Sequence, residues 1–347
     1  MHEASETTKT NEGTTSPSGR SRRVDFSDYP RGWFRVAFSE DVRRGEVKTV
    51  HYFGRDLVLF RGQDGTLSIV GPHCPHLGAH LGHGGKVEGN RLVCPFHGWA
   101  FDAKGELAHV PLAKKLPKRA CLETWSVEEK HGIVFVHVHY DGKPPTYGVP
   151  EIPLFTDPRW GEPIRFRKTF RSTIYDLSEN AVDRAHFGVV HGRACPSTDE
   201  AHMAQIQMEE LGSVLHIHTR YPILVGPLRL EGKLDIHMLD TVISCIVGEG
   251  GVTYGITALP TPIDRETVEN VYVLFTLRRP GPIQWVQNRI VAGFLSSEIE
   301  NDRPIWENKR FVEQPILSDF DGPVVKFRKW FSRYYPERPA DGQRAEA

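Results

Sequence analysis

The stretch "CPHLGAHLGHGGKVEGNRLVCPFHGW", residues 74–99, decides how the N-terminal part of this chain folds. It holds two short motifs of metal-binding side chains, formed by Cys74, His76, Cys94 and His97. Thiolate and imidazole together bind structural zinc and iron–sulfur clusters. Each Cys shares its loop with one His, glycines let main-chain N–H groups approach the sulfurs, and no helix is expected between the loops. The pattern therefore favours an iron–sulfur electron relay, with a zinc knot as the alternative.

The composition is that of a globular protein with more than one domain. The chain has 347 residues, 39% of them hydrophobic and 25% charged, with a formal net charge of −1. This neutrality argues against nucleic acid as a partner, because phosphate binding usually leaves a basic excess. Five Cys without a regular framework indicate a reducing compartment. Because no apolar run is long enough to span a bilayer, we expect a cytoplasmic protein, and a peripheral membrane contact stays open.

The hydrophobic pattern divides the chain into two folded parts and predicts an α+β protein. Residues 25–140 alternate short β-rich runs with turns and read as a small all-β domain. Residues 166–338 combine long strands with helices and predict a large antiparallel sheet flanked by helices. The remaining expected segments are a disordered tail at 1–24, a Pro-rich linker at 141–165 and a disordered tail at 339–347.

A second group of metal-binding side chains lies in "ENAVDRAHFGVVH", residues 179–191. It contains Asp183, His186 and His191 within a segment, 175–191, that reads as a helix. On a straight helix the two His would lie about 140° apart and could not share one metal. We therefore expect a kink or π-bulge near Gly188 that brings them together.

The two groups together resemble the Rieske non-haem iron oxygenases. The first matches the Rieske [2Fe–2S] signature, which implies that Cys74 and Cys94 hold one iron while His76 and His97 hold the other. The second resembles the family's mononuclear Fe(II) motif, with His186 and His191 as metal ligands.

The resemblance also implies a third iron ligand and two further site residues. The family completes its triad with a downstream carboxylate, and Asp302 in "SSEIENDRPIWENK" is the best candidate, with Glu298 and Glu300 as rivals. Asn180 and Asp183 match positions beside the iron ligands that the family uses in catalysis. Asp183 is expected to bridge the two metal centres, accepting a hydrogen bond from His76 or His97 of a neighbouring subunit and holding His186 on its own side.

Three further stretches point to the sterol branch of the family. "PPTYGVPEI", "IENDRPIWENK" and "DGPVVKFRKWFSRYYPE" resemble 3-ketosteroid 9α-hydroxylase oxygenase subunits and cholesterol 7-desaturases. The resemblance implies a helix-grip catalytic domain, a head-to-tail homotrimer, O2 and a sterol or steroid substrate. It also implies a separate electron donor, either a ferredoxin or an NAD(P)H-dependent flavin/iron–sulfur reductase. Apolar residues that could line the substrate pocket are Ile206, Leu215, Ile217, Leu224, Val225, Leu228, Leu230 and Ile243.

Two other functions stay open at this point. The same chemistry could act on an aromatic acid or a methyl ether, because all these substrates use the same kind of iron centre. A non-catalytic Rieske electron-transfer protein is the alternative of another class, and the intact His186, His191 and Asp302 argue against it.

Overall fold

The computed structural model describes residues 23–24, 28–191, 205–225, 228–240, 243–249 and 253–338. For residues 23–24, 222–225, 228–230, 243–245 and 337–338 the description is limited to the main chain. The expected tails fall outside the described residues, except for Arg23–Val24, which forms the two-residue strand β1. This strand pairs with β19 (Glu337–Arg338), so the two ends of the described chain lie side by side.

The N-terminal part consists of three small antiparallel sheets, as its β-rich pattern predicts. The first has the order β10-β11-β2, with β2 at Gly32–Phe38, β10 at Val127–Lys130 and β11 at Ile133–Val138. The second contains β3 (Val47–Tyr52), β4 (Arg55–Arg61) and β5 (Leu67–Val70), and the 3-10 helix η1 spans Ser39–Asp41. The third contains β6 (Lys86–Glu88), β7 (Arg91–Val93), β8 (Ala100–Phe101) and β9 (Leu107–His109).

The C-terminal part is built on the large antiparallel sheet that its long strands predict. Its seven strands have the order β12-β18-β17-β16-β15-β14-β13. The bounds are Ile164–Phe170 for β12, Gln205–Leu211 for β13, Val214–Val225 for β14, Leu228–Asp240 for β15, Ile243–Glu249 for β16, Tyr254–Pro262 for β17 and Val268–Thr276 for β18.

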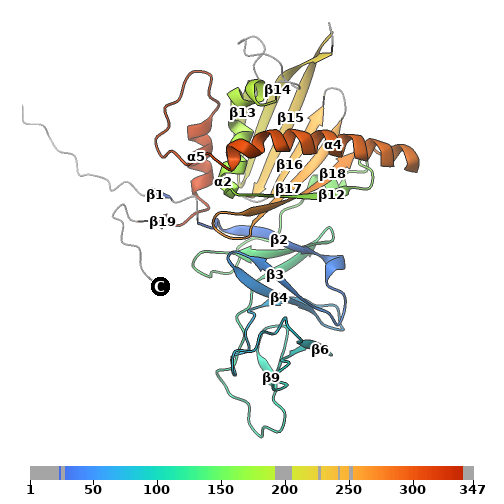
Figure 1. Cartoon of the computed structure of the whole chain (residues 1–347), viewed down its shortest axis with the longest axis vertical. Coiled ribbons are helices and arrows are strands. Elements are labelled where there is room, and N and C mark those ends of the chain that lie inside the picture. The colour runs from blue at the N-terminus through green and yellow to red at the C-terminus, as the bar shows by residue number, and fades with distance from the viewer. Residues whose placement is uncertain are drawn as a thin grey trace, which may run out of the picture.

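Helices cover this sheet at two places. The long helix α4 (Gly281–Trp306) crosses the sheet (Figure 1), where Val291 and Leu295 pack on Ile256 and Leu274. A second group of helices lies near one end of α4 (Figure 1) and includes α2 (Ile174–Glu179), η2 (Asn180–Val182), α3 (Arg184–Val189) and α5 (Val324–Ser332).

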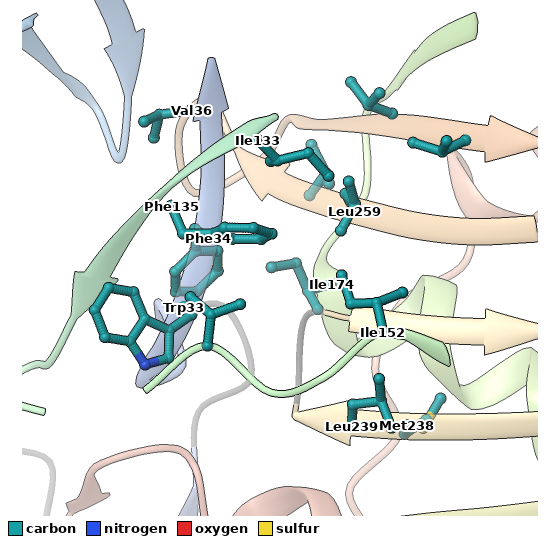
Figure 2. Close-up of a cluster of buried hydrophobic side chains, with 14 of the residues drawn as sticks. Trp33, Phe34, Val36, Ile133, Phe135, Ile152, Ile174, Met238, Leu239 and Leu259 are labelled. Carbon is teal, nitrogen blue, oxygen red and sulfur yellow. The ribbon is translucent and has the colours of Figure 1, made fainter. Parts of the chain in front are cut away.

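The two parts share one hydrophobic core. Trp33 and Phe34 of β2 belong to the same buried cluster as Leu259 of β17 and Ile174 of α2 (Figure 2). The main chain contributes as well, since the amide of Phe53 donates to the carbonyl of Pro262 at 2.9 Å. The all-β part is thus held against the large sheet at β17 by direct packing.

The segment expected to be a surface linker, 141–165, takes part in this packing. Val149, Ile152 and Trp160 are buried, and α1 (Pro153–Thr156) lies between them in sequence. The Pro-rich composition made this stretch look exposed, but its apolar side chains pack into the joint between the two parts.

Candidate metal centres

The two Cys–His loops have the same backbone geometry. In the first, the amide of Cys74 donates to the carbonyl of Ala79 at 2.9 Å, and the carbonyl of Cys74 accepts from the amide of Gly78 at 2.9 Å. In the second, Cys94 makes the same two bonds, with Trp99 at 2.8 Å and Gly98 at 3.1 Å. Both glycines have positive φ, which an L side chain rarely adopts. The β6–β7 hairpin separates the loops, and no helix lies between them, as expected.

The four candidate cluster ligands divide into a buried pair and an exposed pair. Cys74 and Cys94 are 2% and 3% exposed, whereas His76 and His97 are exposed, with their ring centroids 4.7 Å apart. Burial raises the pKa of the Cys74 thiol to about 11, so a thiolate there requires a bound cation. Two buried sulfurs behind two facing imidazoles fit a Rieske cluster, in which thiolates hold one iron and imidazoles the other.

The other histidines of the first loop make local contacts. His80 Nε2 lies 3.2 Å from Asp56 Oδ2, and His73 Nδ1 lies 3.2 Å from the carbonyl oxygen of Gly78. The ring of His76 also stacks on the ring of Trp99, with the ring centroids 4.4 Å apart. These contacts stiffen the loops that present the candidate ligands.

The helix expected at 175–191 is broken, but at a different place from the one expected. The break lies at η2 and Asp183, between α2 and α3, and α3 then runs through Gly188 to Val189 without a π-bulge. His186 lies within α3, and His191 follows its end. The expectation of a kink at Gly188 was therefore wrong. The two His come together because the helix ends between them, and their ring centroids lie 5.2 Å apart.

Asp183 begins the second helix and contacts His186 through its main chain. Its Oδ1 accepts from the amides of Ala185 and His186 at 3.0 and 3.3 Å, so the carboxylate caps α3. His186 Nδ1 lies 2.6 Å from the carbonyl oxygen of Asp183. Asp183 was expected to hold His186 through its carboxylate, and this was wrong in detail. The carboxylate caps α3, and the main-chain carbonyl of Asp183 lies beside His186 Nδ1 instead. The other predicted catalytic residue, Asn180, is half-buried in η2, and its carbonyl accepts from the amide of Asp183 at 3.3 Å.

His186, His191 and Asp302 come together at one point. One possible ligand atom from each lies within 4.8 Å of the other two. Asp302 lies on α4, far from the two His in sequence, and is 7% exposed. Asp302 Oδ1 and His191 Nδ1 are buried and make no hydrogen bond within the described part of the chain. The uncompensated Asp302 oxygen, 3.4 Å from His191 Nε2 and close to a possible ligand nitrogen of His186, fits a bound cation.

The two rival carboxylates lie elsewhere on α4. Glu300 is paired with Lys168 at 2.7 Å and Arg303 at 2.5 Å, and these hydrogen bonds lower its pKa to about 2. Glu298 Oε2 lies 3.0 Å from His191 Nδ1, on the opposite side of the ring from Asp302. Burial lowers the pKa of His191, but the neighbouring carboxylates of Asp302 and Glu298 outweigh it and raise the value to about 9.

Sequence reasoning missed the residues that surround His186, His191 and Asp302. Phe187 lies beside both His rings and stacks on Tyr221 with ring centroids 6.2 Å apart. Glu298 was expected only as a rival iron ligand, and its contact with Nδ1 of His191 was not foreseen, although its side chain is only 17% exposed. The signal available was its spacing of four from Asp302, which puts both on one face of α4.

Few of the expected pocket residues can be placed. Leu215 and Ile217 are fully buried in the hydrophobic core, and Ile206 is half-buried against it. The side chains of Leu224, Val225, Leu228, Leu230 and Ile243 lie outside the described part of the structure.

The class that this fold defines is the Rieske oxygenases. Residues 32–124 match the Rieske [2Fe-2S] domain, and residues 136–335 match the 3-Ketosteroid 9alpha-hydroxylase C-terminal domain. Because the second match covers more than half of the chain, this chain belongs to that family. Its cofactors are accordingly a Rieske [2Fe–2S] cluster and a mononuclear iron.

Curated relatives have similar sequences over most of their length. The chain is 28% identical to "Cholesterol 7-desaturase nvd 1" of Ciona intestinalis over 89% of this chain and 69% of that protein. It is 29% identical to "Probable 3-ketosteroid-9-alpha-monooxygenase, oxygenase component" of Rhodococcus rhodochrous over 93% of this chain and 85% of that protein. The chain is therefore an oxidoreductase, and these relatives are named as a cholesterol desaturase and a ketosteroid monooxygenase. The words "oxygenase component" imply a separate reductase.

Solved structures with this fold have more distant sequences. NdmA of Pseudomonas putida with caffeine superposes with a TM-score of 0.71 at 17% identity, covering 90% of this chain and 97% of that one. Dicamba monooxygenase with dichlorosalicylic acid gives a TM-score of 0.70 at 16% identity, over 90% of this chain and 98% of that one. Within the described residues, no helix has the length and apolar character needed to cross a membrane.

Proposed function

We propose that this enzyme uses O2 and externally supplied electrons to oxidise a sterol or steroid by hydroxylation, desaturation or oxidative demethylation. The observation that carries the proposal is the convergence of His186, His191 and Asp302 within 4.8 Å, in a chain that also brings together two Cys–His loops. Two metal sites with different ligand types, in separate parts of one chain, match an electron relay coupled to an oxygen-activating centre.

The chain's own residues have distinct roles in this proposal. His186, His191 and Asp302 are the Fe(II) ligands, and three ligands leave positions for O2 and substrate. Cys74, Cys94, His76 and His97 are the cluster ligands. Bound iron supplies the activation of O2 once electrons arrive. In a hydroxylation, one oxygen atom enters a C–H bond and the other leaves as water, which consumes two electrons and two protons.

Asp183 and Asn180 form the proposed connection between the metal sites. The β6–β9 end of the chain, which carries the Cys–His loops, lies at the opposite end of the molecule from α2 in Figure 1. A cluster of one chain therefore needs a second copy to come near an iron site, which supports the head-to-tail homotrimer. In that arrangement the half-exposed Asp183 accepts a hydrogen bond from His76 or His97 of the neighbouring copy. A separate ferredoxin or NAD(P)H-dependent reductase reduces the cluster.

The sterol substrate rests on the relatives' names and on family membership. The direct test is turnover of a panel of sterols and 3-ketosteroids with an NAD(P)H-dependent reductase, analysed by mass spectrometry. We expect a product heavier by one oxygen atom after hydroxylation, lighter by two hydrogen atoms after desaturation, or lighter by one CH2 unit after demethylation. If the enzyme oxidises aromatic acids or methyl ethers while every sterol stays unchanged, the substrate class is wrong.

A further inference from the structure

The imidazole of His191 lies between two carboxylates of the same helix. Its Nε2 is 3.4 Å from Asp302 Oδ1, and its Nδ1 is 3.0 Å from Glu298 Oε2. Glu298 and Asp302 are four residues apart on α4, so both side chains project from one face of the helix. All three side chains are at most 17% exposed. The spacing of the two carboxylates along α4 thus places both beside His191, and all three side chains are largely shielded from solvent.

The other imidazole of the proposed iron site, that of His186, also has an oxygen beside its Nδ1. His186 Nδ1 lies 2.6 Å from the carbonyl oxygen of Asp183. A neutral imidazole has one N–H, and an oxygen beside Nδ1 keeps that hydrogen there and leaves the Nε2 lone pair for a metal. An oxygen thus lies beside the Nδ1 of both rings, supplied by the main chain for His186 and by Glu298 for His191.

We propose that Glu298 is a positioning residue, which accepts a hydrogen bond from Nδ1 of His191 and holds Nε2 toward Asp302. This rests on the proposed metal site. His191 Nδ1 and Glu298 Oε2 lie 3.0 Å apart, close enough for a hydrogen bond. Nδ1 is buried, and the described residues offer it no other hydrogen-bond partner. Glu298 is not one of the three residues, His186, His191 and Asp302, whose possible ligand atoms lie within 4.8 Å of one another.

The test measures metal affinity and needs no turnover. The mononuclear iron is removed with a chelator while the cluster is retained, and Co2+ is then titrated into the protein and followed by its d–d absorption. Removing a carboxylate that orients a metal-bound His typically weakens metal binding by about 10–100-fold. We expect Glu298→Ala to weaken Co2+ binding by that factor. Glu298→Gln, whose amide oxygen still accepts from Nδ1–H, should stay within about threefold of wild type.

Glu300→Ala is the matched control, because Glu300 lies on the same helix but pairs with Lys168 and Arg303. It should bind Co2+ as wild type does. Equal affinity of Glu298→Ala and wild type would overturn the proposal. Complete loss of binding in Glu298→Ala with retention in Asp302→Ala would make Glu298 a ligand, which also overturns it. If wild type itself binds no Co2+, the proposed metal site fails rather than the role of Glu298.

Discussion

Nε2 of His191 lies 3.4 Å from Oδ1 of Asp302, although one residue follows α3 and the other lies near the end of α4. The contact depends on two features of the fold. The helix that carries His186 ends before His191, and α4 crosses the sheet so that its last turns reach the same place (Figure 1). Three such donors on one side of a bound metal would leave its other side open for O2 and substrate.

Replacing Asp302 tests the choice of carboxylate. We expect Asp302→Ala to abolish turnover and to deplete the mononuclear iron, because it removes the only charged member of the triad. The visible spectrum of the cluster should not change, since the Cys–His loops lie in the other part of the chain. Iron analysis and absorption spectra measure both effects. Substantial activity in Asp302→Ala, combined with its loss in Glu300→Ala, would show that the wrong carboxylate was chosen.

Asp183→Asn tests the connection between the two metal centres. Asn caps helices as well as Asp does, so α3 should keep its N-terminus and both metals should stay bound. The variant lacks the negative charge that we propose to stabilise a cluster His, so electron transfer to the iron should slow by orders of magnitude. Stopped-flow mixing of reduced enzyme with substrate and O2 follows cluster oxidation. Wild-type oxidation rates in Asp183→Asn would show that Asp183 is not the bridge.

The joint between the two parts contains a buried ion pair whose loss should destabilise the fold. Glu269 of β18 contacts Arg35 of β2 and accepts from the hydroxyl of Tyr52 at 2.6 Å. Because Arg35 is only 4% exposed, Glu269→Ala would leave a buried charge unpaired and should cost about 3–5 kcal/mol in the free energy of unfolding. Urea denaturation measures this cost. Asp319→Ala, at an exposed carboxylate outside this network, is the control and should change the free energy of unfolding by less than about 0.5 kcal/mol.

The same ion pair predicts how stability depends on pH. Burial raises the pKa of Glu269, but the hydrogen bond from Tyr52 and the charge of Arg35 outweigh it, so the value lies below the ordinary 4.5. A carboxylate with a lowered pKa contributes its full stability above its unfolded value and loses it as the pH falls through the folded value. The difference between wild type and Glu269→Ala should therefore narrow below pH 4.5. A constant difference down to acid unfolding would contradict this assignment.

Substrate binding separates the sterol proposal from its nearest alternative. We expect sterols or 3-ketosteroids to bind in the micromolar range through apolar burial, at about 25 cal/mol per Å2. Benzoate-like acids should bind weakly, because the sequence offers no clustered Arg pair in the strands expected to form the pocket. Anaerobic equilibrium binding measures both classes. Tight binding of an aromatic acid, with no binding of sterols, would show that the substrate is an aromatic acid and not a sterol.

Much of the fold could be predicted from local sequence, but several details of the site could not. Residue types and spacing were enough to predict the Cys–His loops, since all four candidate ligands lie in one short stretch. The helix break was misplaced because Gly188 looked like the weak point, whereas Asp183 caps a new helix and Gly322 packs directly on the carbonyl of Val182. The spacing of four puts Glu298 on the same face of α4 as Asp302, but its contact with His191 depends on how α4 is rotated against the sheet, which no local pattern encodes.

Metal and sulfide analysis of the purified protein tests the central claim most directly. A [2Fe–2S] cluster contributes two irons and two labile sulfides, and the triad contributes one more iron. We predict about three irons and about two labile sulfides per chain, together with a Rieske-type visible spectrum. Asp302→Ala should lower the iron content by about one and leave the sulfide unchanged. About one zinc per chain with no labile sulfide would contradict the account.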